Sequence, residues 1–308
     1  MLDTIEEIQT RFEAGGYIAD RSLATSVHLA RTLGKPIFLE GEPGVGKTEL
    51  AKVMAGVLGS ELIRLQCYEG LDVHDALYEW NYLRQLLEVR MQEARGVEKG
   101  QIGRNIFSDE FLLERPLLRA VRWEGPAPAV LLIDEIDRAD EEFEAFLLEV
   151  LSDFQITIPE IGTIKSRQTP FVVLTSNRTR EVHDALKRRC LYQWIDYPDI
   201  EKEWRIICTK VPGIGDQLSF QICRFMELLR EEEFYKRPGI AESLDWARAL
   251  LALGIEELSP DIVADTLSCL LKYKSDQERL TGERLRKAIA VSRNFKPGPT
   301  LSGDSTAI

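Results

Sequence analysis

One segment near the N-terminus combines glycines, a lysine and a threonine at the spacing that binds a phosphate chain. The segment is GEPGVGKT at residues 41–48, which matches the pattern G-x-x-x-x-G-K-[ST]. Its glycines let the backbone turn so that successive N–H groups face an anion, and a helix beginning there adds its positive end. Lys47 would reach the β- and γ-phosphates, and the Thr48 hydroxyl would ligate Mg²⁺. We predict an ATP site made of Gly41, Glu42, Pro43, Gly44, Val45, Gly46, Lys47, Thr48 and Glu49.

A pair of acids follows an apolar run, AVLLIDEID at residues 129–137. Such a run is typical of a strand buried on both faces of a parallel sheet. A carboxylate where that strand ends can hold the Mg²⁺ shell, and we assign this part to Asp134. The adjacent carboxylate, Glu135, could polarise the attacking water. The alternative is a solvated acid pair at the end of a strand.

A third candidate is Asn177, which ends the apolar segment PFVVLTSN at residues 170–177. A neutral amide there can hydrogen-bond water or a γ-phosphate without changing the local charge. Ser176 and Thr175 compete for this role, and an asparagine that ends a strand is also a common turn residue.

A basic run, KRRC at residues 187–190, stands out in an acidic chain and is supported by Arg178 and Arg180. One interpretation is a solvated or phosphate-binding patch. The other is an arginine finger, Arg188 or Arg189, that crosses a subunit interface and stabilises charge on the γ-phosphoryl oxygens.

Strand-like and helix-like segments alternate through the first two thirds of the chain, which predicts an α/β fold with a parallel, doubly wound sheet. We expect continuous helices at 72–94 and 111–122, with Pro116 at a turn or near a helix start. A β-hairpin is expected at 155–166. The expected strands of the sheet are 35–41, 61–68, 129–137, 170–177 and 191–198.

The pattern changes after Pro198, where only helical blocks follow. We therefore predict three parts. They are an α/β nucleotide-binding core at 1–198 with an insertion at about 70–110, a helical domain at 199–293 and a disordered tail at 294–308.

Composition and charge narrow the class of protein. The chain has 308 residues with 44% hydrophobic and 29% charged side chains, which is ordinary for a globular protein. A net charge of −12 weighs against a dedicated nucleic-acid binder, because phosphate backbones need a basic face. The five cysteines form no C-x-x-C pair, which favours reduced thiols over disulfides or zinc. We expect a cytoplasmic protein with no membrane span and no signal peptide.

The order and spacing of these motifs resemble the AAA+ ATPases, and within them the MoxR family and its CoxD-like branch. The resemblance covers about residues 15–293. It implies a five-stranded sheet ordered 5-1-4-3-2, followed by a helical lid over the nucleotide. The segments that carry it are KPIFLEGEPGVGKTELAK, VLLIDEIDRADEEFEAFLLEVLSD, FQITIPEIG, PFVVLTSNRTREVHDALKRRCLYQWIDYP and RPGIAESLDWARAL.

The resemblance also implies roles for single residues. Lys47 and Thr48 correspond to Walker A, Asp134 and Glu135 to Walker B, and Asn177 to sensor 1. Relatives often have Asp-Arg-Phe where this chain has Lys187-Arg188-Arg189-Cys190. An ungapped match favours Arg188 as the finger, and the doubled arginine leaves Arg189 open.

The resemblance places a sensor 2 arginine near the start of RPGIAESLDWARAL, and our candidate is Arg237, one residue out of the usual register. Alternatively, Arg237 caps a helix or pairs with an acid at 231–233.

Members of the family generally form hexameric rings, remodel a client protein and work with a partner that carries a von Willebrand factor A domain. The CoxD-like branch implies a client metalloenzyme, such as a molybdenum-containing carbon monoxide dehydrogenase. A nucleic-acid motor on the same core would need a basic track on its loops, yet the predicted hairpin offers Lys165 against Glu160. A scaffold that binds but barely hydrolyses ATP conflicts with the intact Asp134–Glu135 pair.

Overall fold

The computed structural model describes residues 4–96 and 106–294. The predicted tail from residue 295 on, and residues 97–105 of the predicted insertion, lie outside these ranges. The chain divides into two compact units, which we call the core unit and the helical unit. The core unit comprises Met1–Gly15, Ala19–Gly41 and Lys47–Trp194, and the helical unit comprises Gly16–Ile18, Glu42–Gly46 and Ile195–Ile308.

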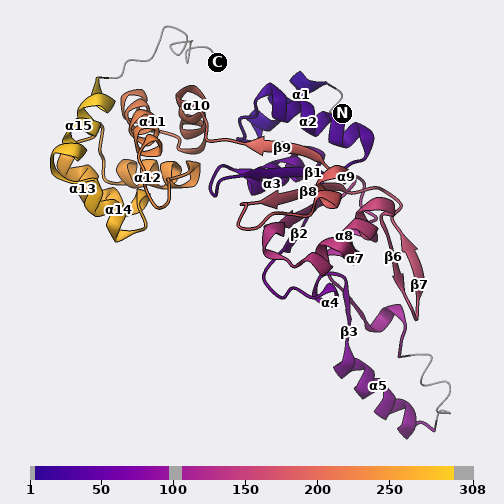
Figure 1. Cartoon of the computed structure of the whole chain (residues 1–308). Helices are drawn as coiled ribbons and strands as arrows, with labels where there is room; N and C mark the ends of the chain where they lie inside the picture. The colour runs from indigo at the N-terminus through magenta and orange to yellow at the C-terminus, as the bar shows by residue number, and fades with distance from the viewer. Residues whose placement is uncertain (1–3, 97–105, 295–308) are drawn as a thin grey trace. The chain divides into compact units, whose positions relative to one another are not determined.

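A five-stranded sheet forms the centre of the core unit, in the order β2-β5-β8-β1-β9 (Figure 1). Counted within this sheet alone, the order is 2-3-4-1-5, which is 5-1-4-3-2 taken from the other edge. The labels differ from those numbers because β3, β4, β6 and β7 form two separate two-stranded sheets. The pairs β1–β8, β2–β5 and β5–β8 are parallel. The strands are β1 (Ile37–Gly41), β2 (Leu62–Gln66), β5 (Val130–Asp134), β8 (Phe171–Ser176) and β9 (Leu191–Ile195).

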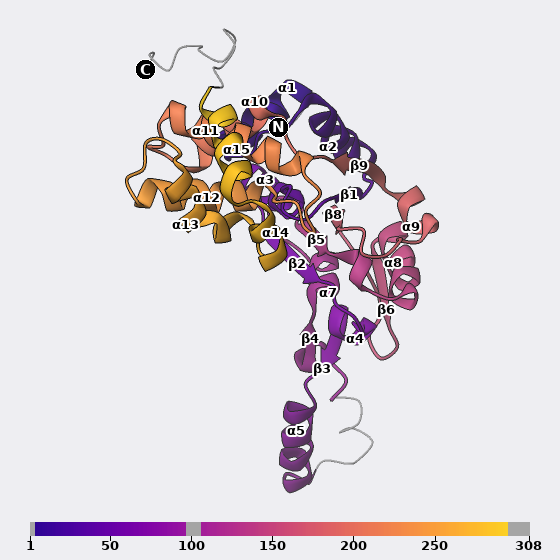
Figure 2. The ribbon, with the colours of Figure 1, turned by 60° about the vertical axis from the view of Figure 1, so that its left-hand side comes forward.

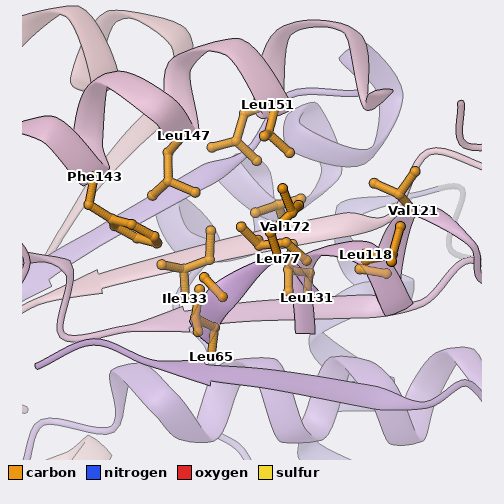
Figure 3. Close-up of a cluster of buried hydrophobic side chains, with 14 of the residues drawn as sticks. Leu65, Leu77, Leu118, Val121, Leu131, Ile133, Phe143, Leu147, Leu151 and Val172 are labelled. Atoms are coloured by element: carbon orange, nitrogen blue, oxygen red, sulfur yellow. The ribbon is translucent and has the colours of Figure 1, made fainter. Parts of the chain in front are cut away.

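The central strands are buried along their whole length, as their apolar runs predict. Every residue of β1, β5 and β8 is buried. Helix α8 (Glu141–Asp153) packs its apolar side on the sheet, where Phe143, Leu147 and Leu151 face Ile133 and Val172 (Figure 3). This unit also contains the helices α1 (Ile5–Ala14), α2 (Arg21–Leu33), α3 (Lys47–Leu58), α7 (Pro116–Val121) and α9 (Asp184–Arg189).

Two of the expected helices are wrong as continuous elements. The segment 72–94 divides into α4 (Val73–Ala76), β3 (Tyr78–Trp80) and α5 (Tyr82–Ala94). The segment 111–122 holds the end of a 3₁₀ turn, then β4 (Leu112–Glu114) and α7, with Pro116 in the first turn of α7 as expected. Strands β3 and β4 pair antiparallel and bury Trp80 against Leu112. This pairing joins segments more than 30 residues apart, so local helical periodicity could not reveal it.

The expected hairpin is present as β6 (Gln155–Ile158) and β7 (Gly162–Lys165), which pair antiparallel. Gly162 has a φ of 102°, a conformation that favours glycine where the chain enters the second strand.

The helical unit contains only helices between residues 200 and 294, and its core is built around Trp246 and Phe225, whose ring centroids lie 5.3 Å apart. None of the helices in the described ranges is both long and apolar enough to cross a membrane. The helices of this unit are α10 (Ile200–Lys210), α11 (Asp216–Glu231), α12 (Ile240–Ala252), α13 (Pro260–Leu270), α14 (Lys274–Arg279) and α15 (Gly282–Arg293).

Candidate nucleotide site

Two residues that are 86 positions apart meet at the end of β5. The Thr48 hydroxyl, in the first turn of α3, donates a hydrogen bond of 2.9 Å to Oδ1 of Asp134. The Thr175 hydroxyl of β8 donates to the same oxygen at 2.6 Å. Asp134 is buried, with 3% of its surface exposed. A hydroxyl beside a carboxylate is an all-oxygen donor set of the kind Mg²⁺ prefers, so Thr48 and Asp134 fit a magnesium ion.

Lys47 lies where the phosphate loop closes. Its side chain is buried, and Nζ donates a hydrogen bond of 2.7 Å to the carbonyl of Gly41. This contact joins the two ends of the loop and keeps the ammonium group inside the turn. A cation held there fits the phosphate chain of a nucleotide.

The middle of the phosphate loop, Glu42–Gly46, belongs to the helical unit and lies against the start of α12. The carbonyl of Gly44 accepts hydrogen bonds from the backbone N–H groups of Ile240 (3.0 Å) and Ala241 (3.3 Å). A Cβ atom on Gly239 would lie 2.9 Å from the carbonyl oxygen of Pro43, so only glycine fits there without a shift. Gly44 itself has a φ of 80°. Sequence analysis missed Gly239, although a glycine directly before a helix was visible.

Glu135 is held between two side chains, one at the end of β2 and one directly after β8. Asn177 donates from Nδ2 to Oε1 at 3.3 Å, and Gln66 at the end of β2 donates from Nε2 to Oε2 at 3.2 Å. The backbone of Glu135 has a φ of 56°, in the left-handed region that a non-glycine residue rarely adopts. Gln66 was not predicted as a site residue.

The three candidates at the end of β8 have different partners. Thr175 contacts Asp134, whereas the hydroxyl of Ser176 lies 3.4 Å from Oε1 of Glu40. Asn177 is the one whose side chain reaches Glu135. Of the three, Asn177 is therefore the candidate that lies beside the second acid.

Arg64 is a further residue of this site that sequence analysis missed. Its Nη2 and Nε donate to Oδ2 of Asp134 at 2.6 and 3.1 Å. Arg64 precedes Gln66 by two positions on β2, so both side chains lie on one face of the strand. That alternation was the signal that could have identified it.

The environment of the acids also affects a buried thiol. Burial raises the pKa of Cys67 from 9.0 to about 12, and the charges of Asp134 and Asp137 add to the shift. This thiol therefore stays protonated at neutral pH, and nothing suggests a nucleophilic role.

The basic run lies on α9, and its members differ in their partners. Lys187 pairs with Glu40 at 3.7 Å, and Nη1 of Arg189 donates to the carbonyl of Leu148 at 3.2 Å. Arg188 is exposed and has no hydrogen-bond or ion-pair partner within residues 4–96 and 106–294. Arg180, which sequence analysis grouped with this run, forms an ion pair with the buried Glu144.

Arg237 is exposed and lies two residues before the N-cap of α12. Neither alternative for it is present: Glu242 bonds the backbone of that N-cap, and no ion pair joins Arg237 to the acids at 231–233 in the described part of the chain. Burial and the charge of Glu42 raise the pKa of Tyr197, whereas Arg230 and Arg237 lower it. Arg237 and Glu42 of the phosphate loop thus act on the same phenol.

These features define a class of protein, the P-loop nucleoside triphosphatases. A lysine closes a glycine loop, a hydroxyl meets a buried acid at the end of a strand, and a second acid is held by an amide. Residues 36–190 match the family model described as the AAA domain (dynein-related subfamily). The chain belongs to this family and is an ATPase of the AAA+ type with a nucleotide-binding core.

Several known proteins are similar to this chain. An uncharacterised protein of Staphylococcus haemolyticus is 27% identical over 286 residues, covering 90% of this chain and 97% of that protein. The gas vesicle ATPase GvpN of Haloferax mediterranei is 28% identical over 264 residues, covering 82% of this chain and 73% of that protein. Among solved structures, the RuvB Holliday junction branch migration motor of Thermotoga maritima covers 86% of this chain and 71% of its own, with 19% identity and a TM-score of 0.46. The similarity to the Staphylococcus haemolyticus protein covers more than residues 36–190 and extends into the helical unit.

Proposed function

We propose that this ATPase couples Mg²⁺-dependent ATP hydrolysis to the remodelling of a client protein, as a member of the MoxR family. The observation that carries the proposal is the arrangement at the ends of β5 and β8, where Thr48 lies on Asp134 and Asn177 lies on Glu135. The MoxR-like motifs and the similarity to a gas vesicle ATPase support the family.

The chain's own residues divide the work of hydrolysis. Thr48 and Asp134 would hold Mg²⁺, which when bound supplies positive charge at the β- and γ-phosphate oxygens. Lys47 offsets the charge that develops on the transferred phosphoryl group. Glu135 orients the attacking water and accepts its proton, while Asn177 and Gln66 fix the two oxygens of that carboxylate.

The free guanidinium of Arg188 supports an assembly in which one subunit completes the site of the next. Arg189 is tied to Leu148 and Lys187 to Glu40, whereas Arg188 extends into solvent without a described partner. We propose that Arg188 is the finger that stabilises the γ-phosphoryl charge of a neighbouring subunit in a ring, with six subunits as the family resemblance implies. For Arg237, we propose the sensor 2 role from the motif resemblance; its charge and that of Glu42 in the phosphate loop both act on the pKa of Tyr197.

The client-binding element that we propose is α5, at the end of the β3–β4 ribbon of the core unit (Figure 2). Leu83 and Tyr82 are 70% and 66% exposed, and Leu86, Leu87 and Met91 are also exposed. These positions recur at helical spacing and form a stripe along α5. An apolar stripe fits an apolar segment of a polypeptide and offers nothing to a phosphate backbone. The β6–β7 hairpin is the second element that we propose to contact the client.

The client and partner are proposed from the motif resemblance. The CoxD-like segments support a molybdenum hydroxylase whose metal centre is matured, together with a partner that carries a von Willebrand factor A domain. We place this activity in the cytoplasm.

The test compares two effectors of the wild-type ATPase. We expect an unfolded, apolar polypeptide to raise Mg²⁺-dependent ATP turnover several-fold, because it would fill the α5 stripe, and single-stranded DNA to leave turnover unchanged. Phosphate release is the measurement, with EDTA as the metal-free control. Stimulation by DNA alone would contradict the remodelling proposal in favour of a nucleic-acid motor.

A further inference from the structure

The carboxylate of Asp134 is already saturated with hydrogen-bond donors. Oδ1 accepts from the hydroxyls of Thr48 and Thr175, and Oδ2 accepts from Nε and Nη2 of Arg64. A carboxylate offers about four lone-pair sites, so these four bonds fill it. A metal ion with its water shell therefore finds a free acceptor site on this acid only after one of these donors has left.

Of the three partners, Arg64 has the most exposed side chain. Its side chain is 51% exposed, whereas the side chain of Asp134 is 4% exposed and Thr175 is buried. Arg64 is therefore the exposed partner of a buried acid. The guanidinium carries a single positive charge on a long, flexible side chain, whereas a divalent cation carries twice that charge and so interacts more strongly with the same acid.

We propose that Arg64 is a displaceable counter-ion of Asp134. It neutralises the buried acid when no metal is bound and must leave Oδ2 before the metal can load. The inference rests on the proposed Mg²⁺-dependent ATPase site and adds a competitor for its metal.

Displacement of Arg64 also affects Glu135, because Gln66 contacts both residues. Arg64 Nη2 donates a hydrogen bond to Oε1 of Gln66, and Nε2 of Gln66 donates to Glu135. When the guanidinium leaves, Gln66 loses the hydrogen bond to its amide oxygen, one of the bonds that orient its amide. Metal loading at Asp134 is thereby coupled to the group that holds Glu135.

The test is a metal titration that does not depend on turnover. Wild type and Arg64→Gln are mixed with a fluorescent ADP, and the Mg²⁺ concentration that gives half of the metal-induced change in binding is measured. We expect this half-point to fall about 3- to 10-fold in the variant, because one partly exposed charge no longer competes. A half-point that is unchanged or higher would overturn the competition.

Matched variants separate this effect from general damage. Arg119 of α7 is 50% exposed and pairs with Glu61, so Arg119→Gln removes a similar ion pair elsewhere and should leave the half-point in place. Arg64→Lys keeps the charge without the two-nitrogen contact and should give an intermediate half-point. If Arg64→Gln does not fold, a half-point for Arg64→Lys equal to or above wild type overturns the inference.

The outcome for wild type distinguishes the two proposals. Nucleotide binding that ignores Mg²⁺ in wild type would contradict the proposed metal site itself. Mg²⁺-dependent binding in wild type, with the same half-point in Arg64→Gln, would overturn the counter-ion and leave the ATPase site standing.

Discussion

Two regions of the core unit differ in the side chains that they present. The ends of β5 and β8 carry hydrogen-bonded acids, whereas α5 carries exposed apolar side chains. At the strand ends, Asp134 and Glu135 have hydrogen-bond partners on both of their carboxylate oxygens. On α5, Leu83 and Leu87 are 70% and 58% exposed. Preorganised polar groups cost little to reorganise at the moment of reaction, whereas an exposed apolar stripe remains to be covered by another molecule. The difference indicates fixed chemistry at one place and binding at the other.

The largest effect is expected at Arg188, an exposed cation on α9 of the same unit. Arg188→Ala should lower ATP turnover about a thousandfold, as loss of an arginine finger does, with nucleotide affinity little changed. Arg189→Ala is the matched control, because that side chain is tied to Leu148. Phosphate release is the measurement.

Mixing subunits tests whether Arg188 acts across an interface. Arg188→Ala combined with Lys47→Ala should recover part of the activity, since one subunit supplies an intact phosphate loop and the other an intact finger. Turnover no higher than that of the separate variants would assign Arg188 to the solvated patch instead.

Glu135→Gln should lower turnover roughly 100- to 1,000-fold while ATP still binds, because the amide keeps the shape but cannot accept the proton. ATP binding by equilibrium dialysis and turnover by phosphate release separate the two effects. Glu141→Gln, an exposed acid in the first turn of α8, serves as the control. Full turnover in Glu135→Gln would remove this residue from the reaction.

Substitutions on α5 should affect stimulation by a polypeptide and leave basal turnover nearly unchanged. Leu83→Asn with Leu87→Asn should leave basal ATPase activity within about twofold, because neither side chain contacts the acids. Stimulation by an apolar polypeptide should fall several-fold, because a polar stripe buries less apolar area. Leu33→Asn, at an exposed position of α2, is the matched control, and equal stimulation in both variants would place the client elsewhere.

The smallest effect concerns the buried thiol beside the acids. The pKa of Cys67 is raised by burial from 9.0 to about 12, so between these pH values the folded thiol keeps a proton that the unfolded thiol releases. The free energy of unfolding therefore falls as the pH rises through that window. Between pH 8 and pH 10, the decrease in the free energy of unfolding should be about 1 kcal/mol smaller in Cys67→Ala than in wild type. Urea unfolding at the two pH values is the measurement. Cys269→Ala, at a partly buried cysteine, is the control, and parallel pH dependences for wild type and Cys67→Ala would contradict the shift.

The phosphate loop, the buried strands and the acid pair could all be predicted from the sequence. Each depends on a local pattern: glycine spacing before a helix at 41–48, and the apolar runs AVLLI at 129–133 and FVVL at 171–174. Burial of every residue in β5 and β8 confirms those runs as central strands. The helical blocks after Pro198 were visible for the same reason, since periodicity is a property of neighbouring residues.

Only the tertiary structure decided which side chains meet. Arg64 is 70 positions from Asp134, and Gln66 is 69 positions from Glu135. Their contacts follow from the parallel register of β2 on β5, which pairs Gln66 with Asp134. The packing of Gly239 on the phosphate loop is likewise set by chain folding, as is the β3–β4 ribbon that interrupts the expected helices. A local pattern shows what a segment can form, whereas the partner of a side chain depends on the register between strands and the close approach of distant segments.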